Sequence, residues 1–454
     1  MNCIFVCIFT QTKYVDMFYL FLESIFIYGN LDDNTNILVY TSTPFMDMIK
    51  KSNLFNDKKI KFEINDSYDN IDRACKARLD LFNLSSINNY KKILYLDTDI
   101  LVKDDINKVF DICKEDLLYV LEEGEIDSKT EYWGNVLFGD EVNNYDDKTA
   151  FISGILLFNN CEKIHYLFDK INEDIIRRPY QFGCYDQPFI IYSAFKYNLY
   201  NNKLLKSVVV NCDHNIHSDK VIHHFPGVPG YYQSKIETMT IFLNNIKDYT
   251  INNNIVETKQ YIDELLLPII NDSNELLEGN IFMLHNSTTY TDMYINKAKN
   301  ISNLVLNKNI KNVIEIGFNS GFSTLLMLLS NPNIHITCFD LGEHRYVIPC
   351  YEKLKETFGD RINLIIGDSR ETLPNISDTV DLIHIDGGHM LEVAESDIMN
   401  SYRLSKQGTI LVMDDYDFSH LHSLWDYYVV RYNLIPLNIN LYDTLQQDVK
   451  YVNL

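Results

Sequence analysis

Short, continuous apolar runs recur through the first half of the chain and alternate with stretches in which apolar residues repeat every three or four positions. The continuous runs are typical of strands buried on both faces, and we expect strands at residues 3–9, 36–40, 60–64, 92–96 and 151–158. The helix-period stretches cover residues 14–28, 71–84 and 159 to about 177. Because strands and helices alternate, we predict a parallel sheet with ligands bound at the carboxyl ends of its strands.

The pattern changes at about Thr238 and stays irregular to about Asn280, with asparagine-rich text at 251–254 and a second polar run at 271–274. From Asn312 the alternation begins again and predicts strands at 313–316, 334–339, 362–366, 380–385 and 409–413. A chain of 454 residues is too long for one ordinary domain. We therefore predict an α/β protein with domains at 1–240 and 260–454, joined by a linker at 241–259.

Composition narrows the function classes. A net charge of -23 argues against a nucleic-acid or anionic-membrane partner, because phosphate binding needs clustered Lys and Arg. The nine cysteines include no Cys-x-x-Cys, so we expect reduced thiols in an intracellular, cytoplasmic protein rather than disulfides or a zinc site. No apolar stretch reaches the ~20 residues of a membrane span. Lys13, Asp16 and Glu23 interrupt the apolar N-terminus, which suits a strand and helix better than a signal peptide.

The strand expected at 92–96 leads directly into two carboxylates, Asp97 and Asp99, after which apolar residues resume. Residues two apart in an extended chain point to the same side, so both carboxylates can converge on one point. Such a pair suits a hard divalent cation that holds a diphosphate. A lone Asp-x-Asp in an acidic chain is more often a solvated turn, so the assignment depends on other segments.

Three further segments, in this order, resemble those of the retaining glycosyltransferases of family 8, the glycogenin and bacterial galactosyltransferase group. They are a sparse basic cluster at Arg73, Lys76 and Arg78, the pair Asp186-Gln187, and the sequence His223-His224-Phe225-Pro226-Gly227. The resemblance spans roughly residues 1–240 and implies a GT-A type, Rossmann-like domain.

This resemblance implies a role for each matching residue. Asp97, Asp99 and His224 would bind Mn²⁺ or Mg²⁺ together with a UDP-sugar, with His223 as the alternative to His224, and mixed oxygen and imidazole ligands suit Mn²⁺. Residues in contact with the donor would be Thr10, Tyr14 and Arg78. Asp186 and Gln187 would face the donor sugar and its reacting anomeric carbon.

The chain also departs from the family pattern. Ile152 stands where the family usually has Asn, and the usual Lys-Pro-Trp after the histidine motif is absent, which leaves Lys235 as the candidate for its phosphate contact. Structural alternatives exist for several residues: Tyr14 as a core contact of the first helix, Arg78 on a solvated face, His223 as a packed core histidine, and Asp186 as a helix N-cap before Pro188.

A glycine-rich turn, Glu315-x-Gly317-x-x-x-Gly321, follows the strand expected at 313–316. Such a turn lets a ligand approach the backbone N–H groups at a helix N-terminus, and Asp340 at the end of the next strand would bind ribose hydroxyls. The turn alone would also serve NAD. The later strand ends favour another cofactor: Gly367-Asp368-Ser369, Asp386-Gly387-Gly388-His389 and Asp414-Asp415.

This second set resembles class I S-adenosylmethionine-dependent methyltransferases over roughly residues 260–454, and among them the metal-dependent O-methyltransferases, some of which act on sugars. The resemblance implies a Rossmann-like domain whose methyl-donor site contains Glu315, Gly317, Gly321, Asp340 and Asp368. It also implies Asp386, Asp414 and Asp415 as Mg²⁺ ligands and His389 as the general base, because the ion lowers the pKa of a sugar hydroxyl and the imidazole accepts its proton. The alternative is that Asp414 or Asp415 caps a helix and His389 lies in a turn.

Together the two halves predict a bifunctional glycan-modifying enzyme that uses a UDP-sugar, S-adenosylmethionine and a glycan or glycoconjugate acceptor, and an oligomer is compatible with the sequence. The alternative is a single-activity enzyme whose other half binds a glycan or nucleotide without catalysis. A purely non-catalytic scaffold is disfavoured, because it has no need for two sets of carboxylates at strand ends.

Overall fold

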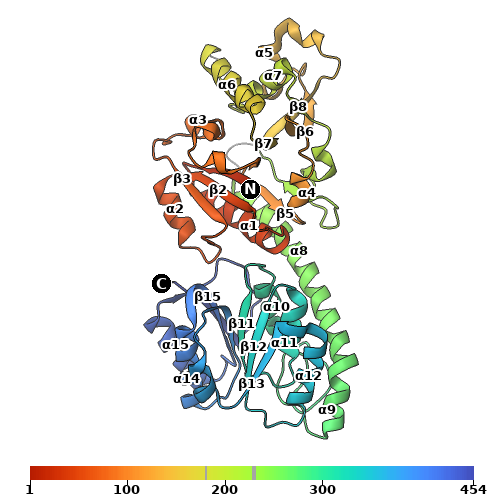
Figure 1. Ribbon diagram of the computed structural model, residues 1–454, viewed down its shortest axis with the longest axis vertical. Helices are drawn as coiled ribbons and strands as arrows, with labels where there is room; N and C mark the ends of the chain where they lie inside the picture. Colours follow the sequence, from red (N-terminus) through yellow and green to blue (C-terminus); the bar gives the residue numbers. More distant parts are fainter. Residues whose placement is uncertain (179–180, 228–231, 454) are drawn as a thin grey trace. The chain divides into compact units, whose positions relative to one another are not determined.

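The computed structural model describes residues 1–178, 181–227 and 232–453 and divides into two compact units, Met1–Leu243 and Asn244–Leu454 (Figure 1). Each unit is built on a seven-stranded sheet of its own. Within the described residues, no helix combines the length and the apolar character needed to cross a membrane.

The sheet of the first unit is mixed, in the order β3-β2-β1-β4-β7-β6-β8. Its first four strands pair in parallel, as expected, whereas β7 runs antiparallel to both β4 and β6. The strands are β1 (Asn2–Ile8), β2 (Thr35–Thr41), β3 (Ile60–Ile64), β4 (Lys92–Leu96), β6 (Leu118–Glu125), β7 (Thr149–Asn159) and β8 (Tyr200–Asn201). A small second sheet pairs β10 (Ile222–His224) with β5 (Ile100–Val102) and β9 (Val209–Asn211).

The helices of the first unit pack around an aromatic core that includes Phe5, Tyr95, Phe151, Phe158 and Phe189. They are α1 (Thr12–Tyr28), α2 (Thr43–Lys50), α3 (Ile71–Ala74), α4 (Asn107–Phe110), α5 (Asn135–Phe138), α6 (Glu162–Arg177) and α7 (Gln187–Tyr197). Short 3₁₀ segments lie at Ala77–Asn83, Ile87–Asn89, Glu131–Trp133, Gly139–Asn144 and Leu205–Ser207.

The expectation of a single helix over residues 71–84 is wrong. The Asn70 side chain caps α3 by accepting a hydrogen bond from the Arg73 backbone N–H at 3.1 Å, but α3 ends at Ala74 and the chain continues as a 3₁₀ turn. Arg78 lies in that turn and is 8% exposed, because its guanidinium pairs inside the protein with Asp186. The Arg78 side chain thus lies in the interior, and the segment that carries it is a 3₁₀ segment and not a regular α-helix.

The second unit has the sheet order β13-β12-β11-β14-β15-β17-β16. The five strands from β13 to β15 pair in parallel, and β17 is antiparallel to both neighbours. Their order reverses between β11 and β14, which is where doubly wound sheets open a crevice for ligands. The strands are β11 (Asn312–Ile316), β12 (His335–Asp340), β13 (Ile362–Ile366), β14 (Val380–Ile385), β15 (Ser405–Asp414), β16 (Leu434–Ile435) and β17 (Gln447–Val452).

Helices cover both faces of this sheet, with α10, α11 and α12 on one side and α14 and α15 on the other (Figure 1). The helices are α9 (Leu267–Ser273), α10 (Ile295–Val305), α11 (Phe322–Ser330), α12 (Val347–Phe358), α13 (Ser369–Thr372), α14 (Leu391–Arg403) and α15 (Ser419–Arg431), with 3₁₀ turns at Gly359–Arg361 and Leu373–Asn375. A long helix, α8 (Tyr232–Tyr261), is followed by a π-helical turn at Ile262–Leu266.

The residues expected as a linker, 241–259, lie inside α8. Within the second unit, Ile251 and Ile255 are buried, and they stand four residues apart on either side of the asparagines. The Asn254 amide donates to the Ser302 hydroxyl of α10 at 3.3 Å. One apolar residue per helical turn therefore keeps the asparagine-rich stretch helical despite the low helix propensity of Asn.

Candidate functional sites

The first candidate centre lies where β4 ends. Asp97 follows β4, Asp99 precedes β5, and His224 ends β10, whose register with β5 pairs His224 with Ile100. One ligand atom of each of these three side chains lies within 4.8 Å of the others, and His224 Nε2 is 3.4 Å from Asp99 Oδ1. The structure thus brings together the three residues that were expected to bind the metal.

His223, the alternative ligand, belongs to the core. Its ring is fully buried, packs against Phe242, and places Nδ1 2.9 Å from the carbonyl oxygen of Asp213. Burial lowers the pKa of His223 because the charged imidazolium loses its water. Alternate residues of β10 point to opposite sides, so only His224 of the two faces Asp99.

Gly154 of β7 closes the other side of this centre. Its carbonyl oxygen accepts a hydrogen bond from the Asp97 backbone N–H at 2.9 Å. A Cβ at this position would lie 2.8 Å from Asp97 Oδ2 and 3.2 Å from His224 Nε2. Only glycine therefore leaves room for these side chains. Asp99 Oδ1 is buried without a hydrogen-bond partner among the described residues, so the centre has an oxygen free to bind a cation.

Two positive side chains surround the carboxylates. Lys235 Nζ lies 2.5 Å from Asp99 Oδ2, and its stem passes Gly227, where an added Cβ would approach Lys235 Cε to 3.1 Å. Burial works to raise the pKa of Asp99, but His224 and Lys235 outweigh it and hold that pKa below its ordinary value. Burial raises the pKa of Asp97, where Arg78 offsets only part of the effect.

Arg78 and Asp186 form a bidentate pair in the interior. Arg78 Nε and Nη2 lie 2.8 and 2.5 Å from the two Asp186 oxygens, and Nη1 donates to the Ser153 carbonyl oxygen at 2.6 Å. Asp186 is fully buried and occupies the N-cap position of α7, but its side chain makes no capping bond. The solvated-face alternative for Arg78 and the helix-cap alternative for Asp186 are therefore both excluded.

The other residues expected around the donor are spread along the same edge. Gln187 Oε1 accepts from the Ser153 backbone at 3.0 Å, and its amide donates to the Tyr132 carbonyl oxygen at 3.2 Å. Thr10, just after β1, has φ 69 and a buried hydroxyl that lacks a hydrogen-bond partner in the described part of the chain. Tyr14 is half-buried on α1. A β-branched residue at positive φ is strained, and such strain gathers at ligand sites.

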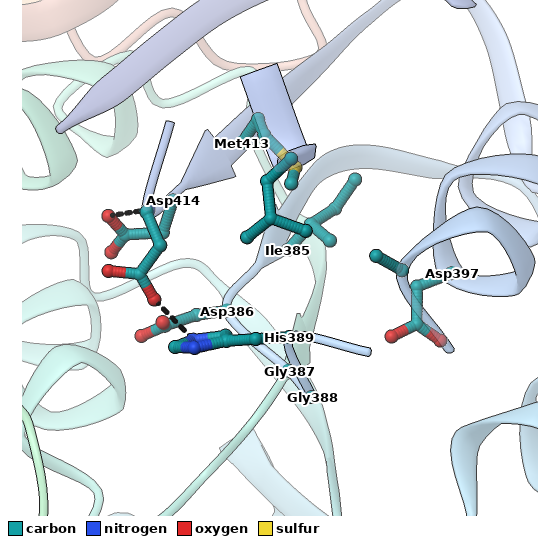
Figure 2. Close-up of a pocket in the computed structure, with 11 residues that line it drawn as sticks. Ile385, Asp386, Gly387, Gly388, His389, Asp397, Met413 and Asp414 are labelled. Carbon is teal, nitrogen blue, oxygen red and sulfur yellow. Dashed lines mark hydrogen bonds and ion pairs between the residues drawn. The ribbon is translucent and has the colours of Figure 1, made fainter. Parts of the chain in front are cut away.

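The second candidate centre lies where β14 and β15 end. Asp386 follows β14, Asp414 ends β15, and Asp415 follows with φ 53. Asp386 and Asp414 gather with His389 on one side of the pocket, and Asp397 lies on the other side (Figure 2). His389 Nε2 is 2.7 Å from Asp415 Oδ2, and this bond raises the pKa of His389. Neither Asp414 nor Asp415 caps a helix, because the next helix, α15, begins only after Phe418.

His384 completes this centre and was not singled out in the sequence. One ligand atom each of His384, Asp386 and Asp414 lies within 4.8 Å of the others. His384 Nδ1 is 3.1 Å from Glu315 Oε1, and Nε2 is 3.4 Å from Asp414 Oδ2. Burial opposes the charged imidazolium, but these carboxylates raise the pKa of His384 to about 10. His384 stands two residues before Asp386, and this spacing in an extended segment is the feature of the sequence that could have identified it.

Glu315 differs from its expected place in the methyl-donor site. It is fully buried, its register partner across the sheet is His384, and its second oxygen accepts a hydrogen bond from the Thr324 hydroxyl. The structure thus places Glu315 inside the sheet, where it supports His384. Lys297 of α10 is a further residue that the sequence analysis missed, with Nζ 2.6 Å from Asp414 Oδ1.

A cavity of about 460 Å³ opens beside this centre and is large enough for a cofactor. Gly317, Asn319 and Ser320 line it together with Asp386 and His389. At Gly317, φ is +97 and a Cβ would lie 1.9 Å from the Asp386 carbonyl oxygen, so the two strand ends meet only because this residue is glycine.

Asp340 is the last residue of β12, and Asp368 lies two residues after the end of β13. Asp340 accepts hydrogen bonds from the backbone N–H groups of Asn319 and Gly342, at 2.7 and 2.8 Å. Gly321 begins α11 with φ +77. Asp368 caps α13, and its Oδ2 lies 2.6 Å from Arg370 Nη2. Asp340 thus holds the turn in place, and the Asp368 carboxylate is engaged by its own helix.

Comparison with known proteins gives a match for each unit. Residues 32–179 match the model of glycosyl transferase family 8, and residues 314–416 match that of a methyltransferase domain. No curated protein matches the chain. The sheet orders confirm the predicted α/β fold class, with two units that are each built on a sheet of their own.

The solved structures similar to the chain include glycosyltransferases and O-methyltransferases. The bifunctional glycosyltransferase WbbM shares 16% identity over 54% of this chain, with a TM-score of 0.39, and the chain spans about half of its length, 51%. Mouse xyloside xylosyltransferase 1 shares 12% identity over 49% of this chain and 97% of its own, with a TM-score of 0.35. CalS11, a TDP-rhamnose 3'-O-methyltransferase, shares 18% identity over 36% of this chain and 78% of its own, with a TM-score of 0.27.

Proposed function

We propose that the protein is a bifunctional glycan-modifying enzyme. Its first unit transfers a sugar from a UDP-sugar with retention of configuration, and its second unit methylates a sugar hydroxyl with S-adenosylmethionine. The observation that supports this most is the pair of separate carboxylate and imidazole centres, each at the carboxyl end of parallel strands. The free thiols of all nine cysteines support an intracellular, cytoplasmic location.

In the first unit, Asp97, Asp99 and His224 would hold Mn²⁺ or Mg²⁺. The ion supplies positive charge to the UDP diphosphate as the bond to the sugar breaks. Lys235 adds a fixed positive charge at the same place, which supports its proposed contact with phosphate. Asp186 and Gln187 would face the donor sugar, while Arg78 holds Asp186 in one orientation. Thr10 and Tyr14 would contact the uracil.

In the second unit, Asp386, Asp414 and Asp415 would hold Mg²⁺, which lowers the pKa of an acceptor hydroxyl. Asp415 bonds one ring nitrogen of His389 and so orients the ring. His389 would accept the hydroxyl proton, and S-adenosylmethionine, when bound, would supply the methyl group that the hydroxyl oxygen takes up. Gly317, Gly321, Asp340 and Asp368 would hold the methyl donor.

Calorimetry of the full chain tests the first activity. Wild-type protein should bind UDP only with Mn²⁺ or Mg²⁺ and hydrolyse or transfer from a UDP-sugar, whereas D97A/D99A should lose both properties. The matched control is D140A/E141A, which also removes two negative charges but from an exposed segment. Unchanged turnover by D97A/D99A would falsify the assignment.

The second activity is tested by H389A and D386A. Both variants should lose methyl transfer to a sugar acceptor while calorimetry still detects S-adenosylmethionine binding, because Asp386 and His389 are assigned to the metal and the proton and not to holding the cofactor. H335A, which removes an exposed histidine from β12, is the control and should transfer methyl normally. If H389A and D386A turn over like the control, the metal and base scheme is wrong.

A single-activity enzyme is the second candidate. Ile152 is nearly buried in β7, and Asp186 and Gln187 are both bonded to protein neighbours, which favours a first unit that binds a nucleotide without catalysis. In that case UDP binding would survive while no acceptor or water receives the sugar. Assays of the full chain with the D97A/D99A and D386A variants separate the two activities.

A further inference from the structure

Lys297 is a buried lysine placed directly on the carboxylates of the second unit. Its side chain is 9% exposed, and Nζ lies 2.6 Å from Asp414 Oδ1 and 3.9 Å from Asp415 Oδ1. It lines the same cavity as Asp386 and His389. Burial of an ammonium group is unfavourable unless it is paired, so this lysine stays there because the carboxylates compensate for its lost hydration.

The helix that carries Lys297 is held in position by a row of amides. Asn296, Asn300 and Asn303 lie on one face of α10, and their side chains donate to the carbonyl oxygens of Asp443, Tyr442 and Asn440 at 2.7, 3.0 and 2.8 Å. The Tyr442 backbone N–H donates back to Asn300 Oδ1 at 2.7 Å. Because α10 is tied to the 440–443 segment, the position of Lys297 is set by the fold.

Both oxygens of Asp414 already face a positive group. Oδ1 accepts from Lys297, and Oδ2 lies 3.4 Å from the His384 ring. Asp415 is shared in the same way, between Lys297 and His389. A divalent ion that binds Asp414 through Oδ1 would meet the ammonium at close range, where the two positive charges repel each other with little screening by water.

We propose that Lys297 is a built-in competitor of the divalent ion, which neutralises Asp414 and Asp415 when no ion is bound and thereby weakens and tunes metal affinity. This inference rests on the proposed methyltransferase function. It makes two predictions that a simple structural lysine does not share. Removal of the charge should tighten metal binding, and it should make the stability of the second unit depend more strongly on the metal.

The experiment uses the full chain in the D97A/D99A background, so that only the second centre binds metal. Isothermal titration with Mg²⁺ alone compares the Mg²⁺ affinity of the D97A/D99A parent, which keeps Lys297, with the affinities of K297M, K297R and K299M in the same background. We expect K297M to bind Mg²⁺ at least about tenfold more tightly, because an unfavourable charge contact is gone. K297R keeps the charge and should stay within about threefold of the parent. K299M, the matched control, removes a lysine from the same helix that faces Tyr442.

Thermal unfolding of the same variants gives a second readout. Without metal, K297M should melt below the parent because Asp414 and Asp415 lose the counter-charge of Lys297, and Mg²⁺ should raise its melting temperature by more than that of the parent. The inference is overturned if K297M binds Mg²⁺ no more tightly than the parent and K299M do. If no variant binds Mg²⁺, the proposed metal site itself is overturned. If K297M does not fold, K297Q provides the comparison.

Discussion

Gly154 of β7 lies directly beside the candidate metal centre of the first unit. A methyl group there would press on Asp97 Oδ2 at 2.8 Å and on His224 Nε2 at 3.2 Å. We expect G154A to fold but to bind Mn²⁺ at least about tenfold more weakly, because both ligands must move apart and small displacements of ligands are costly. Calorimetry with Mn²⁺ in the full chain measures this.

The control for that substitution is G139A, where no atom lies within 4 Å of the added methyl group although φ is +52. It should lose some stability through backbone strain and keep its metal affinity. Equal Mn²⁺ affinity in wild type and G154A would show that the ligands do not converge as the structure places them.

Asp397 is a buried carboxyl outside both candidate metal groups. It is 1% exposed, and burial raises its pKa to about 6 from an ordinary value of 3.8. A carboxyl whose pKa is higher in the folded state favours folding below about pH 4, and this contribution is lost as the pH rises through 6. Asp397→Asn should therefore stabilise the second unit by about 2–3 kcal/mol at pH 7.5 and change little at pH 4.

Denaturant unfolding at both pH values measures the Asp397 effect. The exposed Asp378 is the control, and Asp378→Asn should leave stability unchanged at either pH. A D397N variant that is as stable as wild type at pH 7.5 would mean that the carboxylate is solvated in solution.

At the scale of single elements, α10 is the helix on which the second centre most depends. Asn300 both donates to and accepts from the Tyr442 backbone, at 3.0 and 2.7 Å, and is 2% exposed. N300A leaves two part-buried backbone groups of Tyr442 without partners, and we expect a loss of about 2–4 kcal/mol of unfolding free energy. Urea unfolding, followed by a spectroscopic signal that reports on the second unit, measures this loss of unfolding free energy.

The same helix provides a comparison for that prediction. Asn296 makes one of these bonds, to the Asp443 carbonyl oxygen, in a more exposed position. N296A should therefore cost less than N300A, about 1 kcal/mol. An equal cost for both variants would contradict the idea that burial of the Tyr442 groups is what makes Asn300 important.

At the scale of the whole molecule, the two centres belong to different compact units, Met1–Leu243 and Asn244–Leu454. A ligand that binds only the native state stabilises it by about 2.7 kcal/mol at one hundred times its Kd. We expect UDP with Mn²⁺ to slow hydrogen exchange in the first unit, and S-adenosylmethionine to slow it in the second.

Hydrogen exchange followed by mass spectrometry assigns the protection to peptides of each unit. D97A/D99A should abolish the protection by UDP and leave that by S-adenosylmethionine intact. Protection of both units by one ligand would contradict independent sites and would point to energetic coupling between them.

Several features followed from local pattern. The apolar runs of β1, β2, β4, β11 and β14 identified parallel strands, because strands buried on both faces have few polar positions. Asp97, Asp99, Asp386, Asp414 and Asp415 stand where those runs end, so their location at the sheet edge could be predicted without coordinates. The roles assigned to them remain predictions.

Other features depended on contacts between residues far apart in sequence. Lys297 and His384 belong to no motif, and their place beside Asp414 follows from the docking of α10 on the 440–443 segment and from the β14–β15 register. Arg78, which pairs with Asp186, lies in a 3₁₀ segment where a regular helix was expected. Sequence alone thus determined which strands end in carboxylates, since that is a local property. Tertiary structure decided which cations neutralise them, because charge pairing acts through space.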